Sequence, residues 1–180
     1  MKYFLEPVAV CLNYLKSKYI VHGFPRYSEY DMIGLSGGGW TTTVYSAIDS
    51  RIRSSFPIAG SIPLYLRGNG AATGDREQTY SDFYKISGYL DLYILGSAGS
   101  GRKQVQILNR RDNCCFGADQ HDATRAGSTY DQSVRDYESR VQKTVAALGF
   151  ADAFRLHIDE TAPSHTISRH AIKIILCELG

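Results

Sequence analysis

Residues 32–40 have the sequence MIGLSGGGW, and the rest of the chain is best understood around them. Apolar residues lead into Gly-Leu-Ser-Gly-Gly, and a predicted helix follows at once. This G-x-S-x-G pattern at a strand-to-helix turn is typical of a nucleophile elbow, which exposes the serine hydroxyl. Such a turn is strained and crowded, so we expect Gly34, Gly37 and Gly38 to supply room. Ser36 is therefore the candidate nucleophile, beside backbone N–H groups that favour negative charge.

Composition indicates an ordinary globular domain and excludes several functions. The 180 residues are enough for one domain with a core, 43% of them are hydrophobic, and the net charge is +2. This balance does not favour nucleic acid or an anionic membrane as a partner. No apolar stretch approaches the roughly 18 residues of a membrane span, and the charged N-terminus does not resemble a signal peptide. We therefore expect a cytoplasmic protein.

The four cysteines lack the Cys-x-x-Cys spacing of metal or redox motifs. Cys114 and Cys115 are adjacent, whereas Cys11 and Cys177 fall in predicted helices. We expect all four to be free thiols in a reducing compartment, with the adjacent pair packing beside a loop.

Hydrophobic periodicity predicts alternating helices and strands over residues 1–180, without an internal repeat. The expected helices cover residues 4–18, 40–48, 80–95 (one or two short helices), 130–148 and 167–175, and the expected strands cover 31–35, 54–59, 104–108 and 154–159. This alternation predicts a single α/β domain in which helices flank a mainly parallel sheet with right-handed crossovers.

Three chemically suitable residues follow predicted strands, at the edge of a parallel sheet where sites gather. Ser36 follows the first strand, Asp112 follows the third, and His165 follows the fourth. Serine needs a base to take its proton, which is the role expected for His165. Asp112 would orient the imidazole and stabilise its charged form, and the Gly37 N–H would donate to an oxyanion.

Other acids and bases compete for these roles. Asp119 and Asp122 are rival acids, but Asp112 lies closest to its strand end. His157 lies within a predicted strand and His170 within a predicted helix, so both are weaker candidates for the base.

Metal binding and thiol catalysis are less favoured than solvated or packing roles. Asp119, His121 and Asp122 share a polar loop without a helical i, i+4 pair, and no thiol pKa can be inferred for the adjacent cysteines. We therefore assign neither a metal nor a cofactor.

The elbow, the acid loop and the histidine loop together resemble the C-terminal half of an α/β hydrolase, within which the chain is similar to esterase and acyl-peptidase-like members. Their Ser, Asp, His order is that of this fold. The resemblance implies Ser36 as nucleophile, Asp112 as acid, His165 as base and Gly37 as oxyanion donor, with no cofactor. It also implies an incomplete, N-terminally truncated fold, because only one helix precedes the elbow strand.

The missing strands have two expected consequences. The elbow strand becomes a sheet edge, which predicts a homo-oligomer formed through that edge. The loop that supplies a second oxyanion N–H is also absent, because His22-Gly23 stands too close to Ser36 to serve. Losing one such donor typically costs about 10²–10³ in rate, so we expect weak activity.

These features favour a serine hydrolase that cleaves small carboxylic esters through an acyl-enzyme on Ser36. Residues 61–79 are expected to shape its acyl or leaving-group pocket. A peptidase of the same fold and a non-catalytic binding module are the alternatives.

Overall fold

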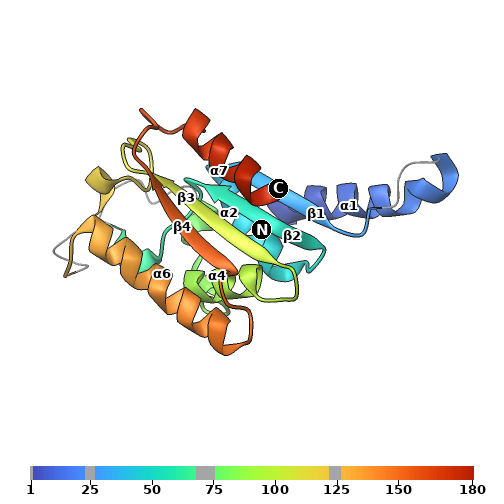
Figure 1. Ribbon diagram of the computed structural model, residues 1–180, viewed down its shortest axis with the longest axis horizontal. Coiled ribbons are helices and arrows are strands. Elements are labelled where there is room, and N and C mark those ends of the chain that lie inside the picture. The colour runs from blue at the N-terminus through green and yellow to red at the C-terminus, as the bar shows by residue number, and fades with distance from the viewer. Residues whose placement is uncertain (1, 23–26, 68–75, 122–126) are drawn as a thin grey trace.

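A four-stranded parallel sheet forms the centre of the computed structural model, which describes residues 2–22, 27–67, 76–121 and 127–180 (Figure 1). The strands are β1 (Tyr30–Leu35), β2 (Ile52–Ile58), β3 (Lys103–Asn109) and β4 (Phe154–Asp159), and they lie in that order across the sheet. Every neighbouring pair is parallel. The predicted class, a mainly parallel sheet with flanking helices, is confirmed.

Helices cover both faces of this sheet. They are α1 (Lys2–His22), α2 (Gly37–Ile48), α3 (Ser81–Tyr84), α4 (Tyr89–Ser97), α6 (Tyr130–Ala147) and α7 (Arg169–Leu179), with short 3-10 turns η1 (Leu64–Leu66), η2 (Arg76–Gln78) and η3 (Ala118–Gln120). The first helix is longer than expected at both ends. The last begins after Ile167, because the Ser168 hydroxyl caps it by accepting the Ala171 N–H at 2.9 Å.

Two apolar cores hold the layers together. On one face, Trp40, Tyr93 and Tyr137 from α2, α4 and α6 pack against the sheet. On the other face, Phe56 and Ile107 belong to the cluster that α7 completes (Figure 1). Full burial of such a side chain contributes about 1.5–3 kcal/mol. The sheet is therefore a rigid support for whatever its edge carries.

Pro57 lies inside the central strand β2, where proline is unusual. The Ala59 N–H donates to the Ile107 carbonyl of β3 at 2.8 Å, so position 57, two residues earlier, faces the same neighbour. Proline has no N–H to donate, and the β2–β3 register has no pair at Phe56 or Pro57. The ladder therefore tolerates the proline by losing pairing at one point.

The strand that leads into the elbow, β1, is an edge of the sheet, as the sequence predicted. Its Ile33 side chain is 49% exposed. Among the described residues, no helix has both the length and the apolar character to cross a membrane.

Candidate active site

Ser36 occupies a sharp turn between β1 and α2. Its φ is 59° and its ψ is −125°, a left-handed conformation that is costly for any residue except glycine. The backbone N–H of Ser36 donates to the Ile58 carbonyl at the end of β2, at 3.0 Å, and its carbonyl accepts from Trp40 at 2.9 Å. These two hydrogen bonds hold the turn, and the Ser36 side chain does not cap the helix.

The glycines that make the turn possible are only partly those expected. A Cβ atom on Gly34 would lie 2.2 Å from the Gly38 carbonyl oxygen, and one on Gly39 would lie 2.7 Å from the Ile58 oxygen. A Cβ on Gly37 or Gly38 would meet none of the described atoms within 4 Å. The expectation that Gly37 and Gly38 supply room was therefore wrong: strand and helix approach closely at Gly34 and Gly39.

Asp112 lies three residues beyond β3 and is almost completely buried. Its Oδ1 atom accepts the backbone N–H groups of Cys114, at 2.9 Å, and Cys115, at 3.2 Å. The loop then turns back on itself and passes close to Asp112 at Gly117. A Cβ atom on Gly117 would lie only 2.5 Å from the Asp112 carbonyl oxygen, so only glycine fits there. Asp112 is thus held by its own loop, with Oδ2 free to serve another group.

That group is His165, in the segment between β4 and α7. The His165 Nδ1 atom lies 2.8 Å from Asp112 Oδ2. An ionised carboxylate only accepts hydrogen bonds, so Nδ1 carries the proton and Nε2 of the neutral ring keeps its lone pair. Nε2 is buried and has no hydrogen-bond partner among the described residues. The ring is therefore oriented as a base with its acceptor atom unused.

Two buried polar residues that the sequence analysis did not identify hold the His165 segment. Asn109 Nδ2 donates to the carbonyls of Ser164, at 3.2 Å, and Thr166, at 2.7 Å, on either side of His165. Asn109 pairs directly with Asp159 at the end of the β3–β4 ladder. In the sequence, the only signal for Asn109 and Asp159 was a polar residue at the end of a predicted strand.

Asp159 holds the same segment at its two ends. Its Oδ1 accepts from the Thr161 N–H at 2.7 Å and the Ala162 N–H at 3.2 Å, and Oδ2 accepts from the Ser168 hydroxyl. Burial opposes ionisation of this carboxyl, but the hydrogen bonds from Ser168, Thr161 and Ala162 outweigh it and lower the pKa of Asp159. The carboxylate form is therefore the one that fits this loop.

The rival acids and bases lie elsewhere. Asp119 is exposed in η3, and Asp122 lies outside the described residues. His170 is exposed on α7, and His157 lies within β4, where burial lowers its pKa. The structure thus brings His165 to Asp112. Both follow the carboxyl ends of their strands, and Ser36 also follows the carboxyl end of its strand.

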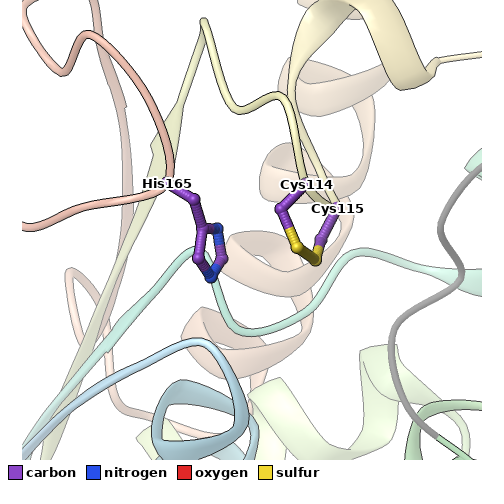
Figure 2. Close-up of side chains that lie close together, drawn as sticks. All are labelled: Cys114, Cys115 and His165. Carbon is purple, nitrogen blue, oxygen red and sulfur yellow. A yellow bond between two sulfur atoms is a disulfide. The ribbon is translucent and has the colours of Figure 1, made fainter.

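The expected free state of the adjacent cysteines was wrong. Cys114 and Cys115 form a disulfide, whereas Cys11 and Cys177 are free and exposed. Figure 2 shows the disulfide beside the His165 ring. Each sulfur lies within 4.8 Å of a ring nitrogen of His165, so these three residues are also the described group best placed to hold a metal ion. Adjacency in the sequence alone did not indicate a bond, because most neighbouring side chains point apart.

Other expectations concern residues beyond this cluster. Residues 23–26 and 68–75 lie outside the described part of the chain, and with them most of the His22-Gly23 loop and the middle of the expected pocket segment.

A cavity of about 390 Å³ is lined by Arg53, Lys103 and Glu178, at the amino ends of the strands. This cavity therefore lies at the opposite ends of the strands from Ser36, Asp112 and His165.

This arrangement of a parallel sheet and strand-end residues is the α/β-hydrolase fold, of which the chain contains part. No family model and no curated protein matches the sequence. Among solved structures, a putative dienelactone hydrolase from Klebsiella pneumoniae subsp. pneumoniae matches with a TM-score of 0.50 and 12% identity, over 94% of this chain and 57% of its own. A methylesterase matches with a TM-score of 0.58 and 15% identity, over 96% and 35%.

A third solved structure, a promiscuous carbohydrate esterase of family 15 from a marine bacterial metagenome, has a TM-score of 0.59 at 10% identity, over 94% of this chain and 45% of its own. The chain therefore spans about a third to three fifths of the length of these structures. At such identities the likeness establishes the fold, which matches the resemblance inferred from the sequence.

Proposed function

We propose that the chain is a serine hydrolase that cleaves carboxylic esters through an acyl-enzyme on Ser36. The observation that carries this proposal is the 2.8 Å contact between Asp112 Oδ2 and His165 Nδ1, together with a buried Nε2 that has no partner among the described residues. A buried nitrogen without a partner is costly unless a substrate or reacting group uses it.

In the proposed reaction, His165 Nε2 takes the Ser36 hydroxyl proton while the serine oxygen attacks the ester carbonyl. Asp112 keeps the imidazole in the required tautomer and stabilises its positive charge. The tetrahedral oxyanion lies at the N-terminus of α2, where the Gly37 N–H donates to it. Collapse breaks the ester bond, and His165 returns the proton to the departing alkoxide.

Water then attacks the acyl-enzyme in the same way. His165 removes a proton from the water molecule, a second oxyanion forms, and the proton passes to Ser36 Oγ as the acid is released. Only Gly37 is assigned as an oxyanion donor, so we expect slow turnover. A single missing donor lowers the rate by about 10²–10³.

The names of the structural neighbours suggest a class of ester to test. One is a methylesterase and another a carbohydrate esterase, so methyl esters of sugar acids are reasonable first substrates beside a short-chain aryl ester. A peptide anilide serves as the comparison for a peptidase.

Labelling with a fluorophosphonate tests the nucleophile directly. We expect Ser36 to be modified in the folded protein, and we expect Ser36→Ala and His165→Ala to block labelling, while Ser100→Ala, in an exposed loop, does not. Folded protein that remains unlabelled would support the non-catalytic binding module instead.

A further inference from the structure

We propose that the reduced Cys114–Cys115 pair and His165 form a binding site for a thiophilic divalent cation such as Zn²⁺, and that the bound ion blocks the base of the proposed hydrolase. The inhibitory consequence rests on the proposed function, whereas the binding site itself does not. The two sulfurs and a ring nitrogen of His165 lie within 4.8 Å of one another (Figure 2).

Once the disulfide is reduced, the three residues can reach the spacing that a small tetrahedral ion requires. Zinc binds thiolates at about 2.3 Å and imidazole at about 2.0–2.1 Å, so neighbouring ligand atoms lie roughly 3.5–3.8 Å apart. In the disulfide the two sulfurs are bonded to each other, so after reduction they must separate to about 3.8 Å, and the ring nitrogen, within 4.8 Å of them, must move by about 1 Å. Three protein ligands leave the fourth position to water.

Asp112 prepares all three ligands. Its Oδ2 occupies Nδ1 of the ring, so Nε2 is the nitrogen that remains available to an ion, and its Oδ1 accepts the N–H groups of both cysteines. A carboxylate behind a histidine ligand is the usual support of a zinc site, because it fixes the tautomer and increases the basicity of the ring.

Reduction opens the site. A dithiol reductant transfers two electrons and two protons, the S–S bond between Cys114 and Cys115 breaks, and the reductant leaves as its own disulfide. Zinc then displaces the two thiol protons into solvent and takes the lone pair of His165 Nε2. The disulfide form has no thiolate to offer, so it does not bind the ion.

The same lone pair is the one that would accept the Ser36 proton. Metal bound at Nε2 therefore stops proton transfer without altering Ser36 or the elbow. We expect the oxidised protein to keep its hydrolytic activity in micromolar zinc. We expect the reduced protein to lose that activity until a chelator removes the ion.

The test uses the full chain with Cys11→Ser and Cys177→Ser, because both of these thiols are exposed and would bind metal nonspecifically. Oxidised and reduced samples, freed of reductant, are titrated with Zn²⁺ in competition with a chromophoric chelator. We expect one ion per reduced chain, bound at least about 100-fold more tightly than by the oxidised chain. With Co²⁺, a thiolate-to-metal charge-transfer band should appear in the near ultraviolet.

Ligand variants assign the site. Cys114→Ser, Cys115→Ser and His165→Asn should each weaken binding at least about tenfold, while His170→Asn, on the exposed face of α7, should not. Circular dichroism establishes that each variant is folded. Binding that is absent from the reduced protein, or unchanged in a folded Cys114→Ser variant, overturns the site.

Activity measured on the same samples separates the two proposals. Stoichiometric binding to a protein that shows no hydrolysis even before zinc is added supports the metal site and counts against the hydrolase. Full hydrolysis by the reduced, zinc-loaded protein overturns the claim that the ion blocks the base.

Discussion

The two regions that meet at the carboxyl edge of the sheet are built very differently. The acid–histidine region, comprising Asn109, Asp112, Asp159 and His165, is held by hydrogen bonds from three segments of the chain. The nucleophile region, comprising Ser36 and the adjoining glycines of β1 and α2, lies on an edge strand. Among the described residues, none pairs with β1 on its outer side.

The difference shows which part of the proposed proton relay is assembled by the described residues. Here the ends of β3 and β4 and the loops that follow them orient the histidine against the carboxylate. An oxyanion site needs donors from two separate segments, and only the Gly37 N–H is assigned here. Under the proposed function, we therefore expect the first region to supply the base and the second region to limit the rate.

The largest expected effect comes from the nucleophile itself. Ser36→Ala should lower kcat for an aryl ester by about 10⁴–10⁶-fold, or to the detection limit, because Ser36 is the proposed site of the acyl-enzyme. His165→Ala should cost a similar amount, and the double variant no more than either. Ser100→Ala is the matched control. Additive losses in the double variant would contradict a shared relay.

Asp112→Asn tests the acid on the other side of the comparison. The amide can donate to Nδ1, which favours the wrong tautomer, and a loss of about 10⁴ in kcat is expected while the fold persists. The exposed Asp119→Asn is the control and should keep full activity. Equal losses in the two variants would remove the reason for preferring Asp112.

Asn109→Ala should affect turnover more than substrate binding. It leaves the Ser164 and Thr166 carbonyls without their donor and loosens His165, so kcat should fall about 10–100-fold while KM changes little. The free energy of unfolding should fall by about 1–3 kcal/mol. Asn113→Ala, exposed in the acid loop, is the comparison. An effect confined to stability would make Asn109 purely structural.

The acid–histidine region should also respond to pH through Asp159. Its folded pKa is lowered, so its contribution to stability is fully present above the pKa of the unfolded carboxyl and is lost as pH falls through the lower folded value. Denaturation measured from neutral pH to pH 3 should show this loss in the wild type, and less of it in Asp159→Asn. Identical pH profiles would show that the loop does not depend on the charge.

The smallest effect on activity is expected at the exposed edge. We propose that β1 pairs with β1 of a second copy, which predicts a dimer or larger species by light scattering at working concentration. Ile33→Lys should shift the protein toward monomer with little change in Ser36 labelling. A monomeric wild type would count against pairing through this edge.

Much of the fold could be predicted because it depends on local patterns. Apolar residues at helical or strand spacing placed all four strands and the helix after Tyr130 within a few residues. The elbow was visible because its glycines and serine are contiguous. The choice of Asp112 followed from its closeness to a predicted strand end, and the structure places Asp112 three residues beyond β3 with its Oδ2 2.8 Å from His165 Nδ1.

What the sequence by itself determined is the order of elements, and hence that Ser36, Asp112 and His165 each follow a strand of one parallel sheet. Only the tertiary structure decided which residues meet. It brought Gly39 against β2, tied Asn109 and Asp159 to the histidine segment, and turned the Cys114–Cys115 disulfide toward His165. The reason is physical: periodicity reports which side of its own element a residue occupies, whereas a contact between elements depends on packing that no single segment encodes.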